Sequence, residues 1–116
     1  MANHGIMLGW NRPITGREAE AGEIFQQSIG YWTRLQKDGM IESFEPVLME
    51  RHGGDLNGFF LIRGERDKLN TVMSTDEYKD LMMRVDHAVG GFGVTRVALG
   101  QELETQMTNW MKLVTR

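Results

Sequence analysis

Apolar residues along this chain fall into stretches that follow either the two-residue period of a strand or the 3.6-residue period of a helix. Short apolar runs bounded by glycine or proline predict strands, and longer stripes at steps of three and four predict amphipathic helices. The longest stripe consists of Ala21, Ile24, Phe25, Ser28, Ile29, Trp32 and Leu35. The expected elements are strands over 5–11, 40–52, 56–64 and 92–99, and helices over 15–38, 74–89 and 103–114.

Local signals predict where the helices begin and end. Thr15 with Glu18, and Ser74 with Glu77, have the spacing of a capping box, in which each side chain satisfies an otherwise unpaired backbone amide. The first two helices should therefore begin near Thr15 and Ser74. Gly39 is the expected C-terminal stop of the first helix.

The second and third strands should form a hairpin, because the turn-forming residues 52–55 separate them. Pro46 cannot donate to a strand ladder, so the second strand should lie at an edge of the sheet. The order strand, helix, strand, strand, helix, strand is that of the ferredoxin-like split βαβ motif, βαββαβ. The sequence thus predicts an α+β fold: one domain over 1–116, with a four-stranded antiparallel sheet and an added C-terminal helix.

The first and third strands are apolar on both faces, as the runs 6–8 (IML) and 59–62 (FFLI) show. The helices of this fold cover one face of the sheet, so the other face would expose an apolar patch larger than monomers usually show. Homodimerisation through that face is the simplest way to cover it. The C-terminal helix could pack on its own sheet or on the partner, and the pattern does not decide between the two.

With this order of elements and these two-sided strands, the chain resembles the dimeric α/β-barrel superfamily over nearly its whole length. That superfamily includes small cofactor-free monooxygenases and muconolactone isomerases. The resemblance implies a ferredoxin-like fold, a homodimer and a small-molecule site without a cofactor. It rests on topology and apolar pattern, so no catalytic residue is carried over from it.

Charge and composition exclude several classes of function. The net charge is −3 and the isoelectric point is near 5.6, whereas nucleic-acid binders normally carry a basic excess. The chain has no cysteine, which removes thiolate metal sites and a cysteine nucleophile. No apolar run approaches the length of a membrane span, and no secretory signal is visible. We expect no nucleic acid or membrane partner, no cofactor and a cytoplasmic location.

Three residues are candidates for catalysis. His87 lies near the predicted end of the second helix, where the helix dipole favours an imidazolium, and His4 opens the first strand. Either could act as a general base. Arg63 ends an apolar strand and could stabilise an anion. The histidines are not at metal-ligand spacing, so no metal site is predicted.

The expected ligand-binding residues gather where strand ends meet the first helix: Trp10, Arg12, Tyr31, Trp32 and Phe60. Aromatic walls can hold a planar apolar ligand, although aromatic residues on such stripes also serve as ordinary core.

Two functions remain open from the sequence. The first is a homodimeric small-molecule-binding domain, which could act as a cofactor-independent monooxygenase or isomerase. The second is a non-catalytic assembly module. A cavity of a few hundred Å³ with convergent polar groups would favour a ligand. A filled core with Trp10 packed on Trp32 would favour assembly.

Overall fold

The computed structural model describes residues 2–115. Its strands are β1 (His4–Trp10), β2 (Arg12–Pro13), β3 (Ser43–Leu48), β4 (Gly58–Gly64), β5 (Val89–Gly90) and β6 (Gly93–Ala98), and its helices are α1 (Glu18–Lys37), α2 (Arg66–Met73), α3 (Asp76–Ala88) and α4 (Gly100–Val114).

The main sheet has four antiparallel strands in the order β3-β4-β1-β6. The two apolar strands β1 and β4 lie at its centre, and Ile6 pairs with Ile62 and Leu8 with Phe60 across them. β3, which contains Pro46, is an edge strand. The predicted ferredoxin-like α+β fold, with its hairpin and its second strand at an edge, is confirmed.

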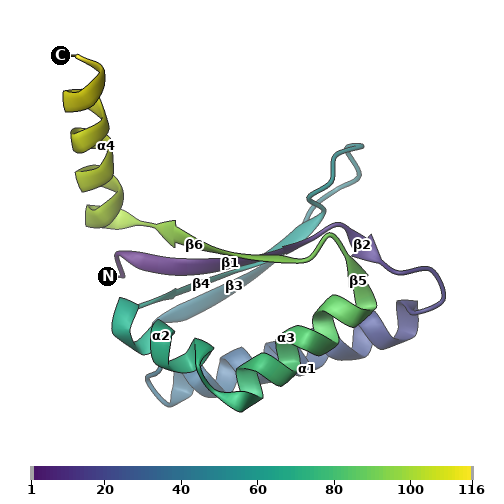
Figure 1. The fold of residues 1–116 in the computed structure, drawn as a ribbon. Helices are drawn as coiled ribbons and strands as arrows, with labels where there is room; N and C mark the ends of the chain where they lie inside the picture. The colour runs from purple at the N-terminus through teal and green to yellow at the C-terminus, as the bar shows by residue number, and fades with distance from the viewer. Residues whose placement is uncertain (1, 116) are drawn as a thin grey trace.

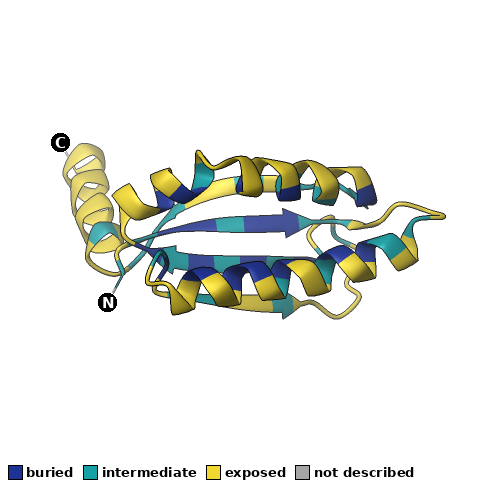
Figure 2. Cartoon of the chain, turned by 90° about the horizontal axis from the view of Figure 1, so that it is seen from below, coloured by how far each residue is buried: buried dark blue, intermediate teal, exposed yellow. Residues whose placement is uncertain are grey.

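Helices α1, α2 and α3 lie on one face of this sheet (Figure 1). Their buried faces meet the inward side chains of the central strands, so the blue stripes of α1 and α3 in Figure 2 face the blue central strands. Ile6, Ile62 and Trp32 are fully buried in this core. Alternation along β4 explains the arrangement, because Gly58, Phe60, Ile62 and Gly64 are buried while the residues between them are only partly covered.

Both capping-box predictions are wrong in position. α1 begins at Glu18, three residues after Thr15, because Gly16 adopts a positive φ of 90° and the chain is still in a turn there. The Glu18 carboxylate accepts a hydrogen bond from the Gly16 amide at 2.8 Å.

The cap of α3 is Thr75 rather than Ser74. The Thr75 hydroxyl accepts from the Tyr78 amide at 3.2 Å, whereas the Ser74 hydroxyl donates to the carbonyl of Thr71 and so completes the end of α2. Two adjacent hydroxyl residues thus serve two helix ends.

A second, two-stranded sheet was not predicted. β2 pairs with β5, with Arg12 opposite Gly90 and Pro13 opposite Val89. Each of these strands has only two residues, which are too few to show a hydrophobic period. The pair ties the end of β1 to the end of α3 through hydrogen bonds from the Asn11 amide to Gly90 and from the Ile14 amide to Ala88.

The face of the main sheet opposite the helices carries Met7 of β1, Phe59 and Leu61 of β4 and Val97 of β6, all only partly covered. We refer to these four residues as the open sheet face. The predicted apolar character of this face is present in the structure. A salt bridge at 3.2 Å between Arg63 and Glu45 borders it.

Candidate functional site

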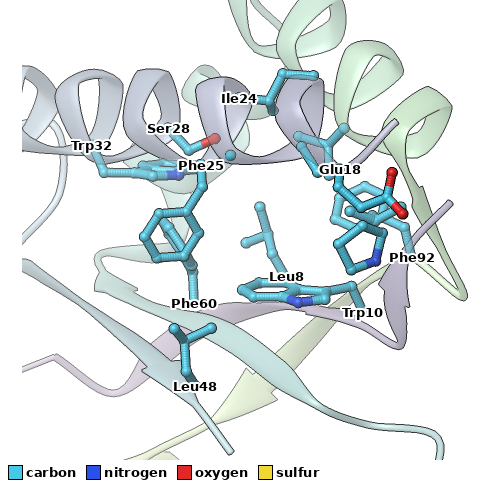
Figure 3. Close-up of a pocket in the computed structure, with 15 residues that line it drawn as sticks. Leu8, Trp10, Glu18, Ile24, Phe25, Ser28, Trp32, Leu48, Phe60 and Phe92 are labelled. Atoms are coloured by element: carbon cyan, nitrogen blue, oxygen red, sulfur yellow. The ribbon is translucent and has the colours of Figure 1, made fainter. Parts of the chain in front are cut away.

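A cavity of about 300 Å³ lies between α1 and the helix-covered face of the main sheet. Leu8, Trp10 and Phe60 line it from the strands, and Phe25, Ser28 and Trp32 line it from α1 (Figure 3). The end of α3 and the segment around β5 close one side through Val85, Val89 and Phe92. The small β2–β5 sheet therefore helps to shape the cavity.

The sequence of α1 explains why a cavity forms there. Ala21, Phe25, Ser28 and Trp32 recur at steps of four, three and four, so they share the buried face of the helix. Ala21 and Ser28 are small, and Gly22 also borders the space. Residues of this size leave room that leucine or phenylalanine would fill.

Three aromatic rings form one wall of the cavity. Phe25 and Phe60 meet edge to face with ring centroids 5.3 Å apart, and Trp10 contacts both rings edge to face at 6.2 and 5.8 Å. Edge-to-face contacts are a preferred packing of aromatic rings. The wall is therefore a packed apolar surface suited to a planar apolar molecule.

Two buried polar groups lie at one end of the cavity, which we call the polar end. Ser28 is 7% exposed and Trp32 is 0% exposed, and Figure 3 shows the Ser28 hydroxyl beside the Trp32 indole. The indole nitrogen Nε1 of Trp32 has no hydrogen-bond partner within residues 2–115. A buried N–H without a partner costs about 1–3 kcal/mol, so this donor favours occupancy by a hydrogen-bond acceptor. Glu18 lies at the opposite end of the cavity.

Trp32 is held on its other side by two tyrosines. Its ring lies 4.8 Å from the ring of Tyr31 and 6.3 Å from that of Tyr78, centroid to centroid. Burial raises the pKa of both phenols above their usual value.

At the surface above this cluster, Arg34 of α1 forms a salt bridge with Glu77 of α3. The hydrogen bond to Arg34 lowers the pKa of the Glu77 carboxyl and raises that of the Arg34 guanidinium. This exposed pair links the surfaces of α1 and α3, and such pairs contribute about 0–1 kcal/mol.

The structure brings three of the five predicted ligand-binding residues, Trp10, Trp32 and Phe60, to the cavity wall. Trp10 and Trp32 belong to separate aromatic groups. Tyr31 lies outside the cavity, where its ring lies under the Arg34 guanidinium at 5.5 Å. Arg12 is exposed on β2 and reaches the neighbouring Asn11 side chain.

The three predicted catalytic residues lie apart from one another. His87 is exposed and its Nε2 contacts the guanidinium of Arg17, next to Glu18 at the cavity mouth. His4 borders a separate hollow, with Arg66 and Arg96, beyond the other end of β1. Arg63 belongs to the opposite side of the sheet and is paired with Glu45.

Sequence reasoning missed Ser28, Phe25 and Glu18 as cavity residues. The signal for Ser28 was available, because it is the one polar member of the apolar stripe on α1. Phe25 belongs to the same stripe and was assigned to the core. Glu18 could not be found in this way, since its place depends on the turn that delays the start of α1.

Two further searches bear on the site. Among residues 2–115, no three histidine, aspartate or glutamate side chains gather in a way that could hold a metal ion. In the same part of the chain, no helix combines the length and the apolar character needed to cross a bilayer.

Comparison with known proteins gives similarity of structure without similarity of sequence. No family model and no curated protein matches the chain. A dimeric protein of unknown function with a ferredoxin-like fold from Bacteroides fragilis is 9% identical, with a TM-score of 0.61, over 83% of this chain and 95% of that one. A dimeric ferredoxin-like protein of unknown function from a Jannaschia species is 13% identical, with a TM-score of 0.61, over 84% and 97%.

A third similar solved structure is that of an enzyme. SnoaB, a cofactor-independent oxygenase from Streptomyces nogalater, is 12% identical with a TM-score of 0.55, over 86% of this chain and 96% of that one. The chain thus has the ferredoxin-like fold. Within that fold it resembles small dimeric proteins and a cofactor-independent oxygenase, as the sequence predicted.

Proposed function

We propose that this chain binds a small, largely apolar or aromatic molecule in the cavity between α1 and the main sheet. The observation that carries the proposal is the combination of an apolar space of about 300 Å³ with the unpartnered N–H of Trp32 at one end. Ligand sites combine apolar walls with a few placed polar groups in this way. Trp10 and Trp32 pack in different groups around an open space, which favours a ligand over a filled core.

The walls indicate the class of ligand. A volume of about 300 Å³ is at the low end for ligand sites, so it suits a molecule of one or two rings. Phe25, Phe60 and Trp10 fit a planar body by edge and face contacts. An indole N–H donates only, so the ligand should place an acceptor such as a carbonyl oxygen against Trp32 and Ser28.

The pair 1-tetralone and tetralin tests this proposal, because the two molecules share a shape and differ by one carbonyl group. Titration followed by the tryptophan fluorescence or by calorimetry should show tighter binding of 1-tetralone. A neutral hydrogen bond contributes about 0.5–1.5 kcal/mol, so the difference should be about two- to tenfold in affinity. Ser28→Ala should reduce that difference, while Gln26→Ala, on the exposed side of α1, should not.

A cavity-filling variant completes the test. Ala21→Leu places a larger side chain on the lining of the cavity and should weaken both probes alike. Equal binding of the two probes to the wild type, or unchanged binding by Ala21→Leu, would count against the cavity as the site.

We also propose that the chain forms a homodimer through the open sheet face. Met7, Phe59, Leu61 and Val97 form an apolar surface that water would otherwise meet, and the structural neighbours from Bacteroides fragilis and the Jannaschia species are dimeric. Light scattering at micromolar concentration should give twice the 13.3 kDa mass of one chain. A monodisperse species of 13.3 kDa would remove this part of the proposal.

Chemistry on the bound ligand is the finer part of the proposal. Similarity to SnoaB supports a cofactor-independent oxidation. An isomerisation is the other option, and a cytoplasmic location is part of the proposal. Of the three residues expected to act, His87 is the best placed, because its partner Arg17 adjoins the cavity residue Glu18. The rival function, a module for assembly alone, is favoured by one observation only, the exposed helix α4.

A further inference from the structure

Helix α4 is an amphipathic helix, and within residues 2–115 its apolar side is exposed. None of its fifteen residues is buried, and its large apolar side chains are between 47% and 62% exposed. Figure 2 shows it almost entirely exposed at one end of the molecule. A solvated helix does not need these side chains, so the exposed stripe indicates a partner surface.

Five of the six large apolar residues of α4 lie on one side of the helix, and Leu113 lies outside that side. The five are Leu103, Met107, Trp110, Met111 and Val114, which we call the arm stripe. Their spacings of four, three, one and three residues place them on one face. Thr105 and Asn109 lie on the opposite side of the same helix.

The start of α4 is held firmly to the body of the protein. The Leu99 amide donates to the carbonyl of Asn3 at 2.9 Å, and the Gln101 amide donates to the Asn3 side-chain oxygen at 3.1 Å. Gly100 makes the turn between them with a positive φ of 50°. These contacts aim α4 away from its own sheet, on the side opposite α1, α2 and α3 (Figure 1).

We propose that α4 is an arm that packs its apolar stripe against a second copy of this chain. This inference rests on the dimer proposed above. The open sheet face and α4 lie on the same side of the molecule (Figure 1), so a protomer seated on that face lies within reach of the arm. Two-fold symmetry makes the contact reciprocal, with each arm on the other protomer.

The dimensions agree with this arrangement. Fifteen helical residues span about 22 Å at 1.5 Å a residue, and packed sheets lie about 10 Å apart. An arm that rises from one sheet therefore passes the facing sheet and reaches the helices behind it. A stable dimer buries about 800 Å² on each protomer. The arm stripe adds five apolar residues to the four of the open sheet face, on the same side of the molecule (Figure 1).

The arm lies after β6, the last strand of the βαββαβ order. The matches cover 95% and 97% of the two dimeric neighbours but only 83% and 84% of this chain. This chain therefore carries residues that the shared fold does not require, which is consistent with a contact of its own.

Two matched double variants test the arm in the full-length protein. Met107→Lys with Trp110→Lys charges the arm stripe, and Thr105→Lys with Asn109→Lys adds the same charges to the opposite side. Sedimentation equilibrium should show a dimer dissociation constant raised roughly tenfold or more by the first pair, and little changed by the second. Circular dichroism should show a folded body in both, because no residue of α4 belongs to the core.

A second measurement uses the absence of cysteine from the chain. Met107→Cys and Thr105→Cys each introduce the only thiol, and the alkylation rate of Cys at position 107 should fall on dimerisation while that at position 105 does not. A monomeric wild type would overturn both the dimer and the arm. The wild type could instead be a dimer whose dissociation constant is unchanged by the charged stripe and in which the two thiols react at unchanged rates on dimerisation. That result would overturn the proposal for the arm but not the proposal of a dimer through the open sheet face.

Discussion

Ile62→Ala is expected to lower the free energy of unfolding by about 2–5 kcal/mol, as a large-to-small change at a closed core position does. Ile62 is 0% exposed in the centre of β4, opposite Ile6 of β1 and beneath the helices. The deletion leaves a hole that neighbours on a paired central strand cannot close. Urea denaturation, followed by circular dichroism, measures this change. The urea concentration at the midpoint of unfolding should fall, while the dependence of the free energy of unfolding on urea concentration stays the same.

Two further substitutions bracket this result. Ile62→Val removes one methylene and should lower the free energy of unfolding by about 0.5–1.5 kcal/mol. Met83→Ala, at an exposed position on α3, should change it by no more than about 0.5 kcal/mol. Similar losses for Ile62→Ala and Met83→Ala would contradict the placement of the core.

Gly5→Ala is expected to lower the free energy of unfolding by roughly 2–3 kcal/mol, at the upper end of the cost of overpacking. A Cβ at Gly5 would lie 2.5 Å from the carbonyl oxygen of Ile62 and 3.2 Å from side-chain carbons of Val97 and Leu99. The first of these is a backbone atom of the paired strand, so relief requires β1 and β4 to move apart. Thermal and urea unfolding both report the loss.

The same substitution elsewhere should have the opposite sign. A Cβ at Gly30, in the exposed part of α1, meets no atom within 4 Å other than the neighbouring residues and backbone of its own helix. Gly30→Ala should therefore raise the free energy of unfolding by about 0.5–1 kcal/mol, because alanine restricts the unfolded chain and favours the helix. Destabilisation by both substitutions would show that the close approach at Gly5 is not the cause.

The fold could be predicted because its strongest signals are hydrophobic patterns that extend over many residues. The stripe from Ala21 to Leu35 and the two-sided runs of β1 and β4 each depend on many residues, so one misplaced boundary does not alter the topology. Caps depend on two residues and were less secure. Thr15 and Ser74 both had a glutamate at the right spacing, but a positive-φ glycine and a competing helix end moved the caps.

The candidate site was predicted only in part, for a physical reason. A cavity arises from missing volume, and Ala21, Gly22 and Ser28 mark it by their small size rather than by their chemistry. Trp10, Trp32 and Phe60 could be predicted because large aromatic residues are easily recognised in a sequence as candidates for a ligand-binding wall. His4, His87 and Arg63 are as easily recognised as candidates for catalysis. The order of residues in the chain does not show, however, that these three lie on different surfaces of the molecule.

The placement of the three tryptophans gives the protein three internal reporters. Trp32 lies at the polar end of the cavity, Trp10 in its aromatic wall and Trp110 on the exposed arm. In a ¹H–¹⁵N spectrum each indole N–H gives its own resonance. The resonance of Trp32 should move when an acceptor enters the cavity, and that of Trp110 when two chains associate. Ligand entry and self-association can therefore be followed separately in one unmodified sample.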